Sequence, residues 1–93
     1  MILGFGCKET EKIWQGERIK KWPVDFQVIL RRKLRMLNNS QNLSDLKIPP
    51  SNRFEALKGD GKGQYCIRIN VQYRICVKWE SGDALDVGIV DYH

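Results

Sequence analysis

The residues with the clearest capacity for chemistry are two arginines in the second half of the chain and the residues that end it. Arg68 and Arg74 lie in apolar, strand-like sequence, and Asp91 and Tyr92 directly precede His93, the one histidine. A guanidinium group binds a phosphate through two parallel hydrogen bonds. An imidazole has a reference pKa near neutrality and so suits proton transfer. This set predicts a site that binds and cleaves a phosphodiester.

Cleavage of RNA without a metal needs three kinds of group. A base removes the 2′-hydroxyl proton, cations stabilise the phosphorane, and an acid protonates the leaving 5′-oxygen. We expect Lys58 to act with the two arginines as a cation, and His93 to be the acid because the carboxylate of Asp91 favours its protonated form. Glu55 or Asp91 would be the base. Tyr92 would stack on a nucleobase or hydrogen-bond the phosphate.

The hairpin that carries the arginines has a predictable register. Apolar residues alternate along 65–69 and again along 73–77, and they share one face only if the connection is odd, as with the three residues 70–72. This register sets Arg68 opposite Arg74. Like charges facing each other on a sheet are unfavourable unless an anion lies between them, and a phosphate fits that place. The alternative is that each arginine forms an ordinary surface ion pair with Glu80, Asp86 or Asp91.

The three cysteines do not predict a metal site. Cys7, Cys66 and Cys76 lack Cys-x-x-Cys spacing, and one histidine cannot complete a usual zinc set. The hairpin register places Cys66 opposite Cys76. An oxidising medium would allow these two to join, but we expect buried thiols in a reducing compartment.

The elements that must position these residues follow from hydrophobic periodicity. Residues 2–7 predict an opening strand, and Thr10 can cap a short helix that stops at Gly16. A longer helix opens at Trp22–Pro23 and ends at 38–40, with its buried stripe formed by Trp22, Phe26, Ile29, Leu30, Leu34 and Leu37.

The second half of the chain changes from helical period to strand period. Residues 41–53 predict a loop with at most one helical turn, near 43–46. Three antiparallel strands follow, with alternating apolar residues at 65–71, at 73–79 and at Leu85, Val87 and Ile89, and with residues 81–83 as the second turn. The order predicts an α+β fold in which two helices pack on one face of the sheet.

Positive charge is concentrated in the first third of the chain. The formal charge is +5, and residues 1–35 hold nine Lys or Arg against four Asp or Glu, whereas residues 36–93 hold seven of each. Arg31, Arg32 and Arg35 lie largely off the buried stripe, so we expect them to bind RNA, with an acidic segment of a protein such as the antitoxin as the alternative partner. A solvated surface is an equally good interpretation of the charge alone. With no apolar run of about 18 residues, residues 1–93 predict one cytoplasmic domain with no membrane partner.

Four motifs give the chain a family resemblance. Residues 57–60 (Leu-Lys-Gly-Asp), 63–70, 72–75 (Gln-Tyr-Arg-Ile) and the closing Asp91–Tyr92–His93 resemble the HigB-type toxins of the RelE superfamily, also called the plasmid killer family. This resemblance implies a compact microbial-ribonuclease fold, no cofactor and cleavage of mRNA, usually on the ribosome. It also implies neutralisation by a HigA-type helix-turn-helix antitoxin. The toxin would bind operator DNA only through this antitoxin.

The resemblance also assigns roles by position. Lys58, Arg68 and Arg74 match the phosphate-handling cations of the family, and residues 91–93 match its C-terminal catalytic group. One position departs, because many relatives have His-Pro where this chain has Glu55–Ala56. Either Glu55 replaces that histidine as the base or Asp91 acts instead, and this departure allows cleavage to be slower than in those relatives.

Two other functions suit the same fold. A non-catalytic module would bind nucleic acid or protein and repress transcription together with an antitoxin, and Glu55 in place of histidine favours it. A ParE-like gyrase poison would not require the paired arginines or the Asp-Tyr-His terminus. A ribosome-associated endoribonuclease is therefore the leading prediction.

Overall fold

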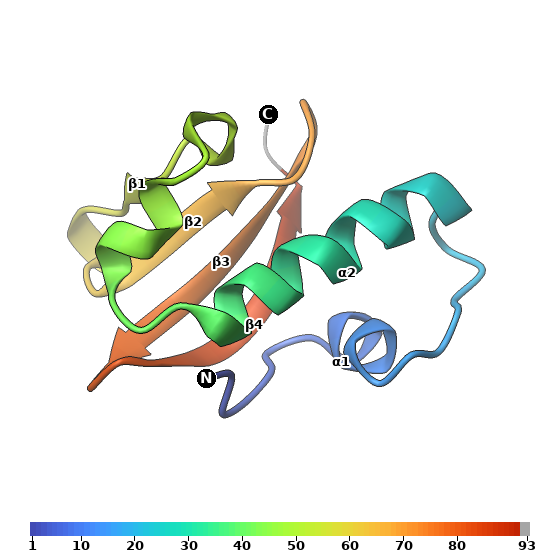
Figure 1. Cartoon of the computed structure of the whole chain (residues 1–93), viewed down its shortest axis with the longest axis horizontal. Helices are drawn as coiled ribbons and strands as arrows, with labels where there is room; N and C mark the ends of the chain where they lie inside the picture. Colours follow the sequence, from blue (N-terminus) through green and yellow to red (C-terminus); the bar gives the residue numbers. More distant parts are fainter. Residues whose placement is uncertain (92–93) are drawn as a thin grey trace.

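The computed structural model describes residues 1–91, which form an α+β fold with helices on one face of an antiparallel sheet (Figure 1). Its two α-helices are α1 (Lys8–Trp14) and α2 (Val24–Asn39), and the sheet order is β1 (Glu55–Ala56), β2 (Gln64–Arg68), β3 (Tyr73–Glu80) and β4 (Asp83–Asp91). The connections include 3₁₀ turns η1 (Leu43–Lys47), η2 (Pro50–Asn52) and η3 (Gly59–Gly61). The predicted class is confirmed, with η2, η3 and the short β1 as additions.

The core lies between α2 and the sheet. Phe26, Leu30, Leu34 and Leu37 follow each other at helical spacing along α2 and are all buried. They join buried strand residues, among them Ile67, Ile75 and Val87, in one cluster. This packing assigns one face of the sheet to the helices and leaves the other face uncovered.

Two details of the predicted helices are wrong. Ile29 is exposed, and the buried position on that turn is Gln27, whose amide bonds the backbone of Ile19 and Trp22. Thr10 does not cap α1 but lies buried inside it, because the helix begins earlier, after Cys7. The predicted stop at Gly16 is confirmed by its positive φ and by its N–H, which donates to the carbonyl of Ile13.

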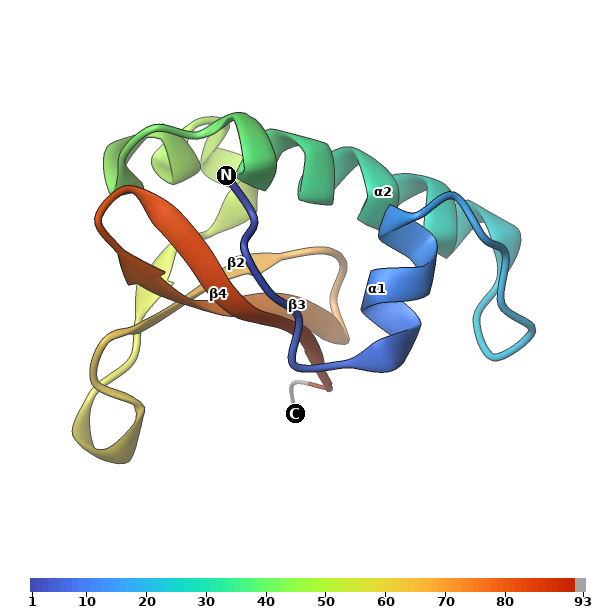
Figure 2. The same ribbon diagram turned by 90° about the horizontal axis from the view of Figure 1, so that it is seen from below.

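The opening residues do not form the predicted strand within the described chain. Ile2 and Phe5 make isolated parallel bridges to Ala84 and Val87, so the segment runs beside β4 without a continuous ladder (Figure 2). Gly4 and Gly6 interrupt the segment and weaken its tendency to form a strand.

A bulge in β4 changes which of its residues face the core. The β3–β4 register shifts between Cys76 and Lys78, and Asp86 takes a positive φ of 51°. Ala84 and Val87 are buried as a result, and Leu85 is only half-buried. The predicted regular alternation of Leu85, Val87 and Ile89 is therefore broken between Leu85 and Val87.

The predicted register of the arginine hairpin is confirmed. Arg68 pairs with Arg74, and Cys66 pairs with Cys76. Strand alternation places these four residues on the uncovered face of the sheet, because Ile67 and Ile75 between them belong to the core. None of the helices in residues 1–91 is long and apolar enough to cross a membrane.

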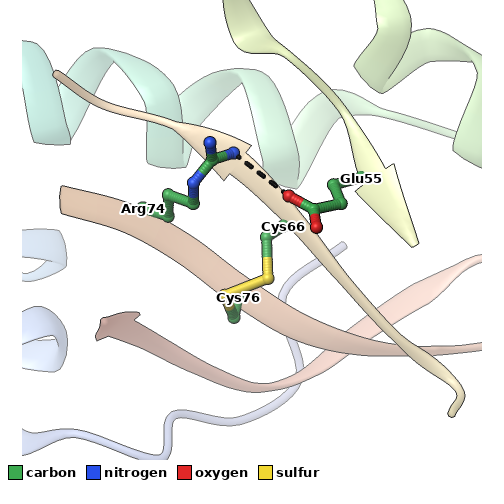
Figure 3. The surroundings of a disulfide bond; sticks show 4 residues. All are labelled: Glu55, Cys66, Arg74 and Cys76. Carbon is green, nitrogen blue, oxygen red and sulfur yellow. Dashed lines mark ion pairs between the residues drawn. A yellow bond between two sulfur atoms is a disulfide. The ribbon is translucent and has the colours of Figure 1, made fainter. Parts of the chain in front are cut away.

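Cys66 and Cys76 are joined by a disulfide bond between β2 and β3 (Figure 3). The expectation that both remain thiols is wrong here, because the register makes them direct cross-strand partners with Cα atoms 4.1 Å apart. Among the described residues, Cys7 is the free cysteine.

Reduction of this disulfide is expected to lower the melting temperature of the protein. The bond closes a loop with a sequence separation of 10 residues, and such a loop stabilises the fold by on the order of 2–3 kcal/mol. This corresponds to a fall of roughly 10 °C or more for a domain of this size. Calorimetry with and without a dithiol reductant measures the shift. The Cys66→Ala/Cys76→Ala variant should not respond to the reductant, and an equal response from both proteins would contradict the expectation.

Candidate functional site

The uncovered face of the sheet carries rows of polar and small residues from neighbouring strands. One row runs Glu55, Cys66, Cys76 and Gly88 across β1 to β4, and a second runs Arg68, Arg74 and Val90 across β2 to β4. These two rows adjoin because residues two apart on a strand point to the same face. The arginine row is therefore next to the disulfide row.

The guanidinium group of Arg74 lies beside the carboxylate of Glu55. The Nη1 and Oε2 atoms are 3.6 Å apart, with the disulfide next to them (Figure 3). The side chain of Arg74 is 14% exposed and that of Glu55 is 45% exposed. Arg74 is thus held in place, whereas the carboxylate meets solvent. The partner of Arg74 is a residue that the ion-pair alternative did not include.

Arg68 completes the pair of cations. Its Nε donates to the backbone carbonyl of Asn70 at 3.1 Å, which orients the side chain along the hairpin. This bond uses one of the five N–H donors of the group. The two arginines thus extend from directly paired positions on one face of the sheet, an arrangement that suits an anion with several oxygen atoms, such as a phosphate.

The other predicted catalytic residues lie in different places. Lys58 is exposed at the start of η3, three residues after Glu55. Asp91 pairs with Tyr73, so alternation places it on the face opposite to Arg74, and its Oδ2 accepts a bond from Nε2 of Gln72. Tyr92 and His93 lie outside the described residues.

A hollow of about 300 Å³ adjoins the ion pair. Its lining combines apolar groups with the two charged side chains, namely Glu55, Leu57, Gln64, Cys66, Arg74, Cys76 and Val90. Because a guanidinium group and an exposed carboxylate line it, this hollow can bind the phosphate of a ribonucleotide, and the carboxylate can accept the proton of its 2′-hydroxyl. We call it the arginine hollow.

The arginines predicted to bind RNA are divided between two surfaces. Arg31, Arg32 and Arg35 belong to α2, which covers the face of the sheet opposite to Arg68 and Arg74 (Figure 1). Arg31 has a structural contact, because its Nε donates to the carbonyl of Ile13 in the last turn of α1 at 3.1 Å and its Nη2 donates to the carbonyl of Glu17, beyond the helix, at 3.3 Å. Arg32 and Arg35 are exposed.

The fourth cation of α2, Lys33, is partly buried. The ammonium group of Lys33 donates to the side chain of Asn52, which is buried and links α2 to η2. Burial, with a smaller contribution from the charge of Arg32, lowers the pKa of Lys33. Lys33 is therefore a packing residue of the loop that precedes β1.

Comparison with known proteins identifies the family. Residues 4–93 match the family described as RelE-like toxin of type II toxin-antitoxin system HigB. The chain belongs to this family. It is also 42% identical over 87 residues to Toxin HigB-1 of Vibrio cholerae, covering 92% of each chain. The HigB-like chain thus matches a known toxin along nearly its whole length.

Solved structures support the same fold for this HigB-like toxin. YafQ of E. coli strain BL21(DE3) superposes with a TM-score of 0.65 over 98% of this chain and 91% of its own, at 14% identity. YoeB in the YoeB–YefM complex of Staphylococcus aureus gives 0.63 over 100% and 95%, at 15% identity. At such low identity these likenesses establish the fold only.

Sequence reasoning missed several residues that line the site of the HigB-like toxin. Leu57, Gln64 and Val90 line the arginine hollow, and none of them was assigned a role in the site, although Leu57 and Gln64 lie within the family motifs. The register places Gln64 on the face of Cys66 and Arg68, which was a usable signal. The position of Val90 opposite Arg74 could be predicted only with knowledge of the bulge in β4. Within residues 1–91, no three His, Cys, Asp or Glu side chains come together as ligands for a metal ion.

Proposed function

We propose that this HigB-like toxin is an endoribonuclease that cleaves mRNA on the translating ribosome without a metal ion. A HigA-type helix-turn-helix antitoxin neutralises it and carries it to operator DNA. Membership of a toxin family of type II toxin–antitoxin systems supports the proposal. So does the 42% identity with a known HigB toxin.

The observation that carries the proposal is the opposed pair Arg68 and Arg74 on the uncovered face of the sheet. Such a pair is costly for the fold by itself, because like charges in direct register repel. A bound phosphate reverses the sign of this interaction. In the cleavage step the 2′-oxygen attacks the adjacent phosphorus, the bond to the 5′-oxygen breaks, and the negative charge that develops lies between the two guanidinium groups.

Glu55 is the better candidate for the base of this reaction. Its carboxylate lies 3.6 Å from Arg74 and is partly open to solvent, whereas Asp91 is placed on the other face of the sheet. Glu55 accepts the 2′-hydroxyl proton, and His93 donates a proton to the leaving 5′-oxygen. Lys58 contributes positive charge near the phosphate. Tyr92 stacks on a nucleobase, and the carboxylate of Asp91 favours the protonated form of His93.

The direct test is cleavage of a defined mRNA by the purified toxin. We expect cuts with 2′,3′-cyclic phosphate and 5′-hydroxyl ends in the presence of programmed ribosomes, unchanged by a chelator and suppressed by the antitoxin encoded beside the toxin. Primer extension maps the cuts. Growth arrest on expression without any mRNA cuts would instead favour the non-catalytic binding module.

The exposed arginines of α2 are proposed to bind ribosomal RNA. Replacing Arg32 and Arg35 by alanine should weaken ribosome binding and reduce the dependence of log K on log salt by about one unit for each phosphate that is no longer neutralised. Filter binding over a range of salt concentrations measures both quantities. Lys20→Ala/Lys21→Ala, which removes the same charge elsewhere on the surface, is the control. An unchanged slope in the arginine variant would exclude α2 as an RNA-binding surface.

A further inference from the structure

The uncovered face has a second hollow, of about 240 Å³, that the proposed chemistry does not use. It adjoins the arginine hollow, since Gln64, Cys76 and Val90 line both. On its other side it is lined by Cys7, Asp86 and Gly88. We call it the glycine hollow. We refer to these two adjoining hollows together as the groove.

The floor of the glycine hollow is the backbone of Gly88. This residue pairs with Cys76, so a side chain at position 88 would point to the uncovered face. Neither the backbone nor crowding requires a glycine here, since its φ is not positive and a Cβ would meet only Cys7 Cβ at 3.6 Å and the Asp86 carbonyl at 3.9 Å. A glycine inside a strand often marks the place where a ligand approaches closely. The missing side chain creates the hollow.

The position of the glycine hollow relates it to the phosphate site. Gly88 and Val90 are two residues apart on β4, about 7 Å, and Val90 pairs with Arg74. A strand of RNA with its phosphate on the arginines therefore has a neighbouring nucleoside within reach of Gly88. The walls suit a flat base, with the apolar Val90 and the disulfide sulfur of Cys76 beside the amide of Gln64, which can donate and accept hydrogen bonds.

We propose that the glycine hollow is a subsite for the nucleobase next to the scissile phosphate, and this rests on the proposed ribonuclease function. The volume lies near the lower limit for ligand pockets and fits one base rather than a larger group. The base enters over Gly88, packs against Val90 and the disulfide, and presents its edge to Gln64. The groove thus positions the RNA while the arginines bind its phosphate.

The test compares intact and abasic RNA on variants at position 88. The probes are tetranucleotides of adenosine with a 2′-deoxy sugar that blocks cleavage, and matched versions lacking the base on one or the other side of the central phosphate. Calorimetry measures their affinities for the whole toxin, and Gly88→Val fills the hollow with a side chain that favours strands. Gly4→Val is the matched control, because a Cβ there meets nothing within 4 Å and Gly4 does not line the groove.

We expect the wild type and Gly4→Val to lose about tenfold in affinity when one of the two bases is removed. Gly88→Val should bind the intact and abasic probes equally, and Gly88→Ala, the milder change, should show an intermediate ratio. Two results would overturn the subsite. One is a Gly88→Val protein that keeps the full wild-type ratio of affinities for the intact and abasic probes. The other is a wild type that binds and cleaves RNA but shows no difference in affinity between these probes. A wild type that neither binds nor cleaves RNA would remove the ribonuclease function, and the subsite with it.

Discussion

Replacing Arg74 by alanine is expected to reduce mRNA cleavage by about 10²–10³-fold while leaving the fold intact. The loss follows because one of the two guanidinium groups that face the developing phosphorane charge is removed, and a single such donor contributes on this scale. Stability should hardly change, since the like-charge pair with Arg68 is relieved and the ion pair with the half-exposed Glu55 contributes little. Single-turnover cleavage and thermal melting measure the two effects.

A matched set of variants separates this role from general positive charge. Arg74→Lys keeps the charge but loses the bidentate fork, so it should remain strongly impaired. Arg68→Ala should resemble Arg74→Ala. Arg18→Ala, an exposed arginine outside the site, should cleave as the wild type does. A fully active Arg74→Ala protein would contradict the assignment of the arginine pair.

Removal of the carboxylate of Glu55 is expected to have the second large effect on the rate of mRNA cleavage. Glu55→Ala should reduce the single-turnover rate by about 10²-fold or more, because the base that accepts the 2′-hydroxyl proton is lost. Since the carboxylate is 45% exposed, added formate can enter the vacated space and restore part of the rate. Glu55→Gln keeps a polar contact for Arg74 but cannot accept the proton, so it should be equally slow and should not respond to formate.

The same experiment on Asp91 decides between the two candidate bases. Asp91→Ala should lose less activity and show no rescue by formate, because the pairing with Tyr73 places residue 91 on the other face of the sheet. If formate instead rescues Asp91→Ala and leaves Glu55→Ala unchanged, Asp91 is the base. Glu55 would then act only by positioning Arg74.

The amino-acid sequence determined those features that depend on local periodicity. The odd connection at residues 70–72 set the whole register of the hairpin, because a shift by one residue would expose Ile67 and Ile75. The three- and four-residue spacing of α2 likewise determined its buried side. These two patterns were enough to place both arginines on one uncovered face, and the motifs around them were enough to predict the family.

Only the tertiary structure decided how distant segments meet. Glu55 reaches Arg74 because the two-residue strand β1 pairs with β2, and so short a strand has no periodic signal. The bulge at Asp86 shifts the register of the second half of β4 against β3 by one residue, and Val90 therefore pairs with Arg74. Arg31 turns from the predicted RNA surface to the backbone carbonyls of Ile13 and Glu17, because α1 packs against α2.

The difference has one physical reason. Alternation along a strand and spacing along a helix are read from neighbours in the chain, whereas ion pairs, bulges and grooves depend on which segments lie side by side after the core has formed. Packing of α2 against the sheet selected the uncovered face. The ion pair of Glu55 with Arg74 and the space above Gly88 followed from strand pairings that no single segment encodes.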